Sequence, residues 1–549
     1  MSPVSLSTPV CDGAGVPLDP TAAHLGEVLA SLARPGAYPH PVDGVTVIQT
    51  HVSVIFLAGP FAYKVKKPVH FDFLDAHTLE GRAAMCAQEV ALNRRLSPDL
   101  YLGVVPITRG PRGLTVGGSG EAVEYAVQMR RLPEERMMDR LLQARALTRE
   151  MVEQVAEVLA PFHASADAGP RVAAFGTPEA VQTLWDEHFA QVTPFLGKTL
   201  TSIQDGYLRA VSAAWMVRKR RQLEERVAQG RIRDGHGDLR TSSVCFTEPL
   251  TIFDCLDFSA RFRCSDVASD VAFLAMDLRL RMRPDLAEAF VQRYVARSGD
   301  SALRRLLPFY VCYRACVRGK VESLRAEEPE VSPADRGEAA RMARRAFGIA
   351  CDAASEDLPP LLLVVSGLSG SGKSTLAGEL GRRRGWEVFS SDVVRKALHG
   401  LAPGERATAA IDTGLYAPEA TRRTYERLAS DAGAALDQGK CVIVDATAQA
   451  AWQREGLASA ARAHGGLFLL AEVRASDEVI RARLEARSRE PGAVSDAGWD
   501  VYLAQKARWE PVTLEDWAHL VIDGNLPAAD ALQQLEHDLH ERLRPPRVL

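Results

Sequence analysis

One short stretch of the chain has the residue types and spacing of a phosphate-binding loop. GLSGSGKST, residues 367–375, satisfies G-x-x-x-x-G-K-[ST] between an apolar run, LLLVVSG, and a helical pattern, TLAGELGRRR. In such a loop, backbone N–H groups turn toward a β-phosphate, and the following helix N-terminus adds partial positive charge. We expect Lys373 to bridge the β- and γ-phosphates of ATP and Ser374 to hold Mg²⁺. The expected nucleotide-binding residues of this loop are Gly367, Gly370, Ser371, Gly372, Lys373, Ser374 and Thr375.

A carboxylate and a guanidinium follow shortly after this loop. FSSDVVRKAL, residues 389–398, places Asp392 and Arg395 just beyond the next expected strand, at the sheet edge where ligands collect. Because they are three residues apart, they share one face of a helical turn. Asp392 could then take a hydroxyl proton while Arg395 steadies a phosphate or substrate anion. The structural alternative is a helix-capping aspartate beside a solvated arginine.

Two further segments add charged groups to this half. CVIVDAT ends an apolar strand at Asp445, the position for a carboxylate that orients Mg²⁺ through water. RARLEARSRE carries four arginines and could fold over the phosphates as a lid that supplies positive charge in the transition state. Arg483 and Arg487 are the lid residues that we expect, with a solvated arginine-rich helix as the alternative.

The first half carries a different signature, GHGDLRTSSVCF at residues 235–246, followed by LTIFDCLDF. It is similar to the aminoglycoside phosphotransferase branch of the protein-kinase-like fold, whose loop reads H-G-D-x-x-x-x-N. The resemblance implies that Asp238 is the hydroxyl-orienting base and Asp254 the principal Mg²⁺ ligand. It also implies a strand lysine that grips nucleotide phosphates, matched by Lys64 in AYKVKKPV. The helical ion-pair partner of that lysine is matched by Glu89 in CAQEVALNRRL.

This resemblance covers about residues 45–345 and departs from the family pattern at Ser243. The family has an asparagine there that supplies a neutral oxygen to a metal ion. Serine offers a shorter hydroxyl that can also bind Mg²⁺, but from a different distance. An active first kinase and a degenerate one that only binds a ligand or partner both stay open. Downstream, we interpret Asp266 and Asp270 as start and first-turn acids of a helix.

The second half, from about Leu361 to about Arg544, resembles the P-loop small-molecule kinases. This group includes gluconate kinase-like, chloramphenicol phosphotransferase-like, zeta-toxin-like and polynucleotide 5′-kinase proteins. Its hydroxyl-activating D-x-x-R pair is matched by Asp392 and Arg395. The whole arrangement resembles a bacterial family of aminoglycoside phosphotransferase-like and P-loop ATPase fusions.

The elements that must position these residues follow from the apolar patterns. VTVIQTHVSVIFL and FAYKVKKPV predict a β-hairpin, LEGRAAMCAQEVALNRRL a helix and EAVEYAVQMRRL a strand. From residue 361 on, apolar strands alternate with helices, which favours a parallel sheet covered on both faces. The fold class is therefore a bilobal α+β kinase-like domain followed by an α/β P-loop domain. We expect a tail and short helix over 1–44, the kinase-like domain over 45–345, a linker over 346–360 and the P-loop domain over 361–549.

Composition limits the classes of partner. The 549 residues are 46% apolar and carry a net charge of -4, which gives no general attraction to nucleic acid or anionic membrane. Nine cysteines lack any C-x-x-C pair, as expected of reduced thiols in a cytoplasmic protein. The N-terminus lacks a basic start followed by an apolar run, and no stretch reaches the ~18 apolar residues of a membrane helix. No pattern indicates an oligomeric state.

Taken together, these patterns predict an ATP- and Mg²⁺-dependent phosphotransferase. Its P-loop domain would act on a hydroxyl of a small polar molecule, such as a sugar, sugar acid or antibiotic-like compound. The kinase-like domain would bind or also phosphorylate substrate. A nucleic-acid 5′-hydroxyl kinase is the first alternative, since RKRRQLEERV and RMARRAF are basic, although solvated helix faces explain both. The second alternative is a non-enzymatic, nucleotide-gated regulatory module, which would need no hydroxyl-activating pair.

Overall fold

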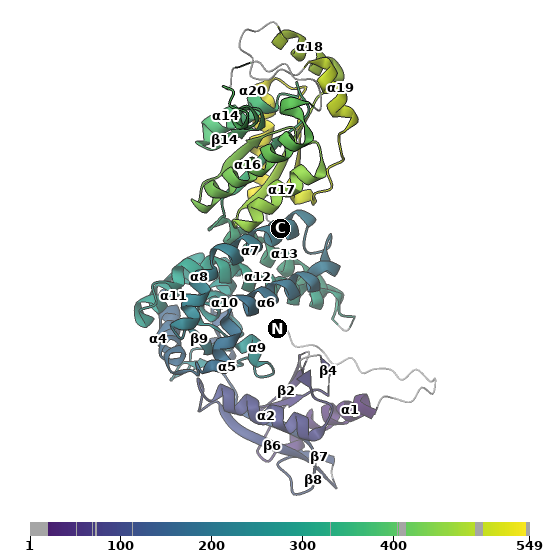
Figure 1. The fold of residues 1–549 in the computed structure, drawn as a ribbon. Coiled ribbons are helices and arrows are strands. Elements are labelled where there is room, and N and C mark those ends of the chain that lie inside the picture. Colours follow the sequence, from purple (N-terminus) through teal and green to yellow (C-terminus); the bar gives the residue numbers. More distant parts are fainter. Residues whose placement is uncertain are drawn as a thin grey trace, which may run out of the picture. The chain divides into compact units, whose positions relative to one another are not determined.

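The computed structural model describes residues 20–50, 52–68, 70–71, 74–111, 113–329, 331–402, 405, 413–488 and 498–544. The chain divides into two compact units, each made of two segments. Unit 1 comprises residues 1–176 and 226–307, and unit 2 comprises residues 177–225 and 308–549. Figure 1 shows the elements of each unit along the chain.

A six-stranded antiparallel sheet, in the order β1-β2-β3-β8-β6-β7, forms one part of unit 1. The expected hairpin is present, because β2 pairs with both β1 and β3. Val54, Phe56 and Tyr63 pack under the sheet with the short helix α1. The strands are β1 (Val45–Gln49), β2 (Ser53–Ala58), β3 (Phe61–Lys66), β6 (Tyr101–Gly110), β7 (Gly113–Val116) and β8 (Glu121–Arg130).

The rest of unit 1 is mainly helical, with three short strand pairs. The helices are α1 (Pro20–Leu32), α2 (Leu79–Asn93), α3 (Met138–Gln143), α4 (Arg149–Ser165), α5 (Pro170–Ala173), α9 (Ala260–Arg263), α10 (Val267–Leu280) and α11 (Pro284–Ser298). The short strands are β4 (His70–Phe71), β5 (Leu74–Asp75), β9 (Ile232–Asp234), β10 (Val244–Cys245), β11 (Thr251–Ile252) and β12 (Cys264–Asp266).

Unit 2 contains a five-stranded sheet in the order β14-β15-β13-β16-β17, with every pair parallel. The parallel sheet predicted for the second half is thereby confirmed. All the carboxyl ends of the strands lie at one edge, which is where the phosphate loop follows β13. The strands are β13 (Leu361–Ser366), β14 (Glu387–Ser390), β15 (Val442–Asp445), β16 (Leu467–Arg474) and β17 (His519–Asp523).

Helices cover both faces of this sheet because its strands are apolar on both sides. Helices α16 and α17 pack on one face, shown in front of the strands in Figure 1, and α14 and α20 pack against strands and each other. The helices that follow β13 along the chain are α14 (Lys373–Arg384), α15 (Ser391–Leu398), α16 (Pro418–Asp437), α17 (Ala451–Ala463), α18 (Asp477–Ser488), α19 (Trp499–Ala507) and α20 (Ala528–Leu543).

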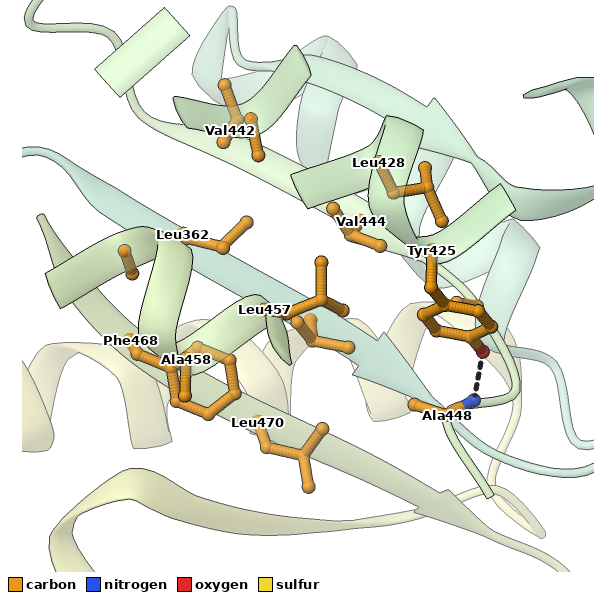
Figure 2. Close-up of a cluster of buried hydrophobic side chains, with 14 of the residues drawn as sticks. Leu362, Tyr425, Leu428, Val442, Val444, Ala448, Leu457, Ala458, Phe468 and Leu470 are labelled. Atoms are coloured by element: carbon orange, nitrogen blue, oxygen red, sulfur yellow. Dashed lines mark hydrogen bonds between the residues drawn. The ribbon is translucent and has the colours of Figure 1, made fainter. Parts of the chain in front are cut away.

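The core on the α16–α17 face interlocks strands and helices (Figure 2). Alternate strand residues such as Val442, Val444 and Leu470 are fully buried against Leu428 and Leu457 of these helices. At the edge of this core, the hydroxyl of the buried Tyr425 accepts a hydrogen bond of 2.9 Å from the backbone N–H of Ala448. The core therefore also fixes the loop that follows β15.

Unit 2 also includes helices from the segments that precede the P-loop sequence. They are α6 (Pro178–Val192), α7 (Ser202–Arg218), most of α8 (Arg220–Ala228), most of α12 (Leu303–Glu327) and α13 (Pro333–Ser355). The linker that we expected over 346–360 is helical as far as Ser355, and its alanines are buried. A helix forms there because small apolar residues recur at helical spacing.

Two compositional expectations can be compared with this structure. Within the described ranges, no helix combines the length and the apolar character that crossing a bilayer requires. The cysteines in the same part of the chain are free thiols, and all but Cys441 are buried. The cytoplasmic location stays a prediction.

Candidate functional site

The phosphate loop of unit 2 connects the end of β13 to the first residue of α14. Gly370 and Gly372 have φ values of +83° and +103°, a left-handed backbone that residues with a side chain rarely adopt. A Cβ at Gly370 would lie 3.0 Å from Ile480 Cγ2, so helix α18 also leaves no room for one. The loop is therefore shaped by its glycines, with Lys373 and Ser374 in the first turn of α14.

Asp445 lies at the centre of the expected chemistry. It ends β15, where it pairs in register with Val365 of β13 and Ser390 of β14. Burial raises the pKa of the Asp445 carboxyl above its usual value, against the opposing effects of Lys373 and the Ser374 and Ser390 hydroxyls. The structure thus brings Asp445 into the electrostatic range of the phosphate loop.

The chemistry around Asp445 fits a magnesium ion that is shared with phosphates. Its Oδ1 is buried and has no hydrogen-bond partner within the described part of the chain. The described residues contain no cluster of three or more His, Cys, Asp or Glu side chains that could hold a metal. Mg²⁺ often takes only one or two protein oxygens and otherwise binds water and substrate phosphates. Asp445 and Ser374 match that pattern.

Asp392 and Arg395 form an ion pair on α15, with Nη1 2.8 Å from Oδ1. The Arg395 side chain is only 12% exposed, and its guanidinium lies 5.0 Å from the ring centre of Tyr416. Its Nε is buried without a hydrogen-bond partner in the described ranges. Asp392 also acts on Asp445, disfavouring the ionised form of that carboxyl and so raising its pKa. Arg395 is therefore not a solvated helix residue, and the pair lies within electrostatic range of Asp445.

Helix α18 provides one contact of the expected lid. Arg483 donates from Nη1 to the carbonyl oxygen of Ser371 at 3.0 Å. Ile480 and Leu484 pack with Leu368 of the phosphate loop. Arg487 belongs to α18, but its side chain lies outside the described residues.

A hollow that our sequence reasoning missed lies beside the phosphate loop. It has a volume of about 360 Å³, within the range of small-molecule sites. A Cβ on Gly524 would lie 2.8 Å from the Ser371 carbonyl oxygen, so the loop after β17 touches the phosphate loop. The Gly-Asn pair directly after the last strand could have indicated it. The hollow is lined by Arg474, Ala475, Val521, Ile522, Asp523, Asn525 and Gln534.

In unit 1, two acidic residues that are distant in sequence meet at one lysine. Lys64 of β3 lies 2.8 Å from Glu89 of α2 and 2.8 Å from Asp254. Asp254 has a φ of +61°, a strained conformation for a residue with a side chain and one that clusters at functional sites. The Lys64 ammonium lowers the pKa of Asp254 to about 2. The structure therefore joins these three expected residues.

The loop that carries Asp238 is held by a carboxylate to which we had assigned only a place in a helix. Asp270 of α10 accepts hydrogen bonds from the backbone N–H groups of His236 at 2.7 Å and Gly237 at 2.8 Å. A Cβ on Gly235 would lie 2.4 Å from Asp270 Oδ2, which explains the glycine. Asp266, in contrast, caps α10 as expected, accepting from Ala268 N–H. An acid within a mainly apolar helical pattern was the available signal for Asp270.

Asp238 and Ser243 are both engaged by one arginine. Arg240 donates to Asp238 Oδ1 from Nε at 3.0 Å and to Oδ2 from Nη2 at 2.8 Å. The Ser243 hydroxyl donates to the carbonyl oxygen of Arg240 at 2.8 Å and accepts from its N–H at 3.0 Å. The serine that we expected to be a metal ligand is therefore used in a local backbone contact.

Comparison with known proteins places this chain among bacterial relatives. The uncharacterized protein Rv2004c of Mycobacterium tuberculosis is 33% identical over 480 residues, which cover 85% of this chain and 91% of the relative. The chain belongs to the Rv2004c family. Because so much of the chain is matched, the family likeness extends over parts of both units.

Other likenesses of this member of the Rv2004c family concern smaller parts of the chain. A family model described as an AAA domain matches residues 362–512. A guanylate kinase of Anaeromyxobacter dehalogenans is 32% identical over 159 residues, 25% of this chain and 70% of that protein. The structure of a sugar kinase from Janibacter sp. HTCC2649 shows 23% identity and a TM-score of 0.26 over 33% of this chain and 95% of its own. The C-terminal part is a P-loop kinase-like domain.

Proposed function

We propose that the protein is an ATP-dependent phosphotransferase whose P-loop unit phosphorylates a hydroxyl of a small polar molecule. The observation that carries this proposal is the Asp392–Arg395 ion pair, because Asp392 lies within electrostatic range of Asp445, which in turn interacts with Lys373 of the phosphate loop. A non-enzymatic, nucleotide-gated module would require the phosphate loop but not a carboxylate that accepts a proton from an acceptor hydroxyl. The acceptor that we propose is a sugar, sugar acid or antibiotic-like compound.

The phosphate donor would be held by groups that the loop already presents. The backbone N–H groups of the loop and the N-terminus of α14 attract the β-phosphate, and Lys373 reaches the β- and γ-phosphates. Arg483 already lies against the loop at Ser371 and supplies positive charge from the lid side. We assign the hollow lined by Arg474 and Asn525 to the base of the nucleotide, since Gly524, which lies between the lining residues Asp523 and Asn525, approaches the Ser371 carbonyl oxygen of the phosphate loop.

Asp445 and Ser374 would hold Mg²⁺ with the phosphates. Bound Mg²⁺ neutralises charge on the β- and γ-phosphate oxygens during transfer. The protein's contribution is the buried, unpartnered Oδ1 of Asp445, an oxygen for which hydrogen bonding in the described residues does not compete. Lys373 and the two nearby serine hydroxyls favour its ionised form, which is the form that binds a metal.

The acceptor would lie against α15. Its hydroxyl oxygen attacks the γ-phosphorus as the bond to the β–γ bridging oxygen breaks, and Asp392 accepts the hydroxyl proton. Arg395 fixes the carboxylate through Nη1 and keeps its buried Nε available for an oxygen of the acceptor or of the phosphoryl group. The products are the phosphorylated acceptor and ADP.

Unit 1 resembles the aminoglycoside phosphotransferases, and we propose that it binds a nucleotide or phosphorylated ligand with or without transfer. Support comes from Lys64, which contacts both Glu89 and Asp254, as a phosphate-gripping lysine of that fold would. Asp238 is held in a bidentate contact by Arg240, so its availability as a base is reduced. P-loop-dependent transfer is therefore expected to dominate.

Substitution of Asp392 tests the main proposal. Asp392→Asn should keep the affinity for ATP and lower phosphoryl transfer by about 10²–10⁴-fold, because the proton acceptor is lost while the loop is intact. Transfer is measured with radiolabelled ATP over a panel of sugars, sugar acids, aminoglycosides, nucleosides and a 5′-hydroxyl oligonucleotide. Asp431→Asn is the matched control, since Asp431 is a half-buried i,i+4 ion-pair partner of Arg427 on α16. Undiminished transfer by Asp392→Asn would leave the pair without a catalytic role.

A further inference from the structure

Ser243 of unit 1 stands where the aminoglycoside phosphotransferase loop has a metal-binding asparagine, and this position is closed to a metal ion. Ser243 is buried, and its hydroxyl both donates to and accepts from the backbone of Arg240. Its backbone is also fixed, since the Ser243 carbonyl oxygen accepts from Phe253 N–H at 3.0 Å. A serine oxygen is shorter in reach than an asparagine oxygen, and this one is turned to the loop itself. The residues at this corner therefore do not fit a second Mg²⁺.

A guanidinium occupies the same corner. Arg240 grips both oxygens of Asp238, the residue five positions before Ser243. Burial disfavours its charge, but Asp238, Asp277 and Asp254 together raise the pKa of Arg240 above its usual value, so it stays protonated. Asp277 is oriented toward this loop, because it accepts from the N–H and the hydroxyl of Thr241 at 2.9 and 2.6 Å. A fixed positive charge thus lies among three carboxylates.

The charge balance favours one metal ion rather than two. Lys64 already neutralises Asp254 on one side of the site, and Arg240 neutralises Asp238 on the other. A second dication would need oxygen ligands that these cations hold, and it would be repelled by the guanidinium at contact distance. Arg240 Nη1 has no hydrogen-bond partner in the described part of the chain, so one N–H group is free for an oxyanion.

We propose that Arg240 replaces the second metal ion of unit 1, so that this unit binds a nucleotide phosphate with a single divalent cation, held by Asp254. The inference rests on the proposed nucleotide-binding role of unit 1. A guanidinium is suited to this role because it presents several N–H groups in a plane that matches phosphate oxygens. Unlike a metal ion, it stays in place when the nucleotide leaves.

The test counts divalent ions that depend on Asp254. Full-length Lys373→Ala protein is titrated with Mn²⁺ and a non-hydrolysable ATP analogue, and bound Mn²⁺ is measured by electron paramagnetic resonance with and without Asp254→Asn. One Asp254-dependent Mn²⁺ per chain is expected. Subtracting the Asp254→Asn value removes any Mn²⁺ that remains at the P-loop.

Variants of Arg240 and Ser243 distinguish the contribution of the Arg240 guanidinium from that of a second divalent ion. Arg240→Ala should weaken Asp254-dependent nucleotide binding by at least about tenfold, and added Mn²⁺ should not restore it, whereas Arg240→Lys should restore part of it. Ser243→Asn combined with Arg240→Ala should admit a second Asp254-dependent Mn²⁺, and Ser243→Asn alone should not. Arg149→Ala, which removes an exposed arginine of α4 that pairs with Glu153, should change nothing.

Two outcomes overturn the inference in different ways. Two Asp254-dependent Mn²⁺ ions in the Ser243 protein would mean that unit 1 binds nucleotide in the ordinary two-metal manner, and unchanged nucleotide affinity in Arg240→Ala would mean that Arg240 takes no part in binding. The nucleotide-binding role would then stand and the inference would fall. Absence of any Asp254-dependent nucleotide or Mn²⁺ would remove the proposed role of unit 1, and the inference with it.

Discussion

The side chain of Asp445 is buried at the end of β15, and burial opposes its ionisation. A raised folded-state pKa means that the protonated form is favoured by folding. The corresponding stability is fully present below the unfolded-state pKa and is lost as the pH rises through the folded-state pKa. At neutral pH, Asp445 therefore destabilises the ligand-free protein and becomes favourable only when a cation is bound beside it.

Replacing Asp445 by asparagine should show that the ionised carboxylate destabilises the ligand-free protein and stabilises the cation-bound protein. Without ligand, Asp445→Asn should be more stable than the parent protein near pH 7 by about 1 kcal/mol, or roughly 2–4 °C in Tm, and should lose that advantage near pH 3.5. With Mg²⁺ and a nucleotide at about 100 times its Kd, the parent protein alone should gain about 2.7 kcal/mol. Thermal unfolding across pH measures both effects. A stability difference that does not change with pH would show that the charge of Asp445 is not its cause.

Single residues differ in how far the sequence alone assigns them. Lys373 and Ser374 stand in a motif whose spacing determines their place in the first turn of a helix, so geometry and pattern agree. Asp270 could not be assigned in this way, because its partners are backbone N–H groups about thirty residues away. The role of Ser243 also depends on a side-chain orientation, and orientation is set by packing that the sequence pattern does not contain.

Secondary-structure elements were the most predictable level. The hairpin, the strands β13, β15 and β16 and the alternation with helices all follow from apolar periodicity. The order of the strands in the sheet was harder to predict. β13 pairs with β15 and β16 and not with β14, the strand that follows it directly in sequence. The hollow beside the phosphate loop could not be predicted without that order, because its lining residues come from the ends of β16 and β17.

The loop before Asp238 provides a prediction about local geometry. In Gly235→Ala, the new Cβ would lie 2.4 Å from Asp270 Oδ2, so the carboxylate must move and weaken its bonds to His236 and Gly237. We expect a loss of about 1–3 kcal/mol in unfolding free energy, measured by urea denaturation. Gly26→Ala is the control, since its Cβ would meet nothing within 4 Å and the helix α1 should gain up to about 1 kcal/mol. Equal stability of the two variants would contradict the assigned contact.

At the scale of the whole molecule, the P-loop sheet is packed with helices from the preceding sequence. Helix α7 contacts the turn at Asp516–Ala518, where a Cβ on Gly206 would lie 2.7 Å from Trp517 Cβ. Trp215 of α7 donates from Nε1 to the carbonyl oxygen of Asp357 at 2.8 Å. These contacts join segments that composition had suggested assigning to different domains. No local pattern signals such packing, because each helix is simply amphipathic.

A fragment that begins at Leu361 tests this packing. It lacks α7 and α13, so it exposes Trp517 and Gly465, which Arg218 and Ala214 of α7 cover in the full chain. We expect residues 361–549 alone to unfold at lower urea concentration than a chain in which 177–225 and 308–549 are joined by a flexible linker. Circular dichroism and size-exclusion chromatography measure stability and association. If the shorter fragment is as stable and monomeric as the joined chain, α7 contributes no support to the sheet.

The interleaved order of the segments has a consequence for synthesis on the ribosome. Residues 177–225 emerge before the rest of unit 2, which begins at residue 308. At about 5–20 residues per second, the remaining chain takes on the order of tens of seconds to appear. During that time the apolar face of α7 has no sheet to cover, and residues 226–307 of unit 1 emerge in between. Nascent chains that stop between Glu225 and Leu361 should therefore be the species that depends most on chaperones.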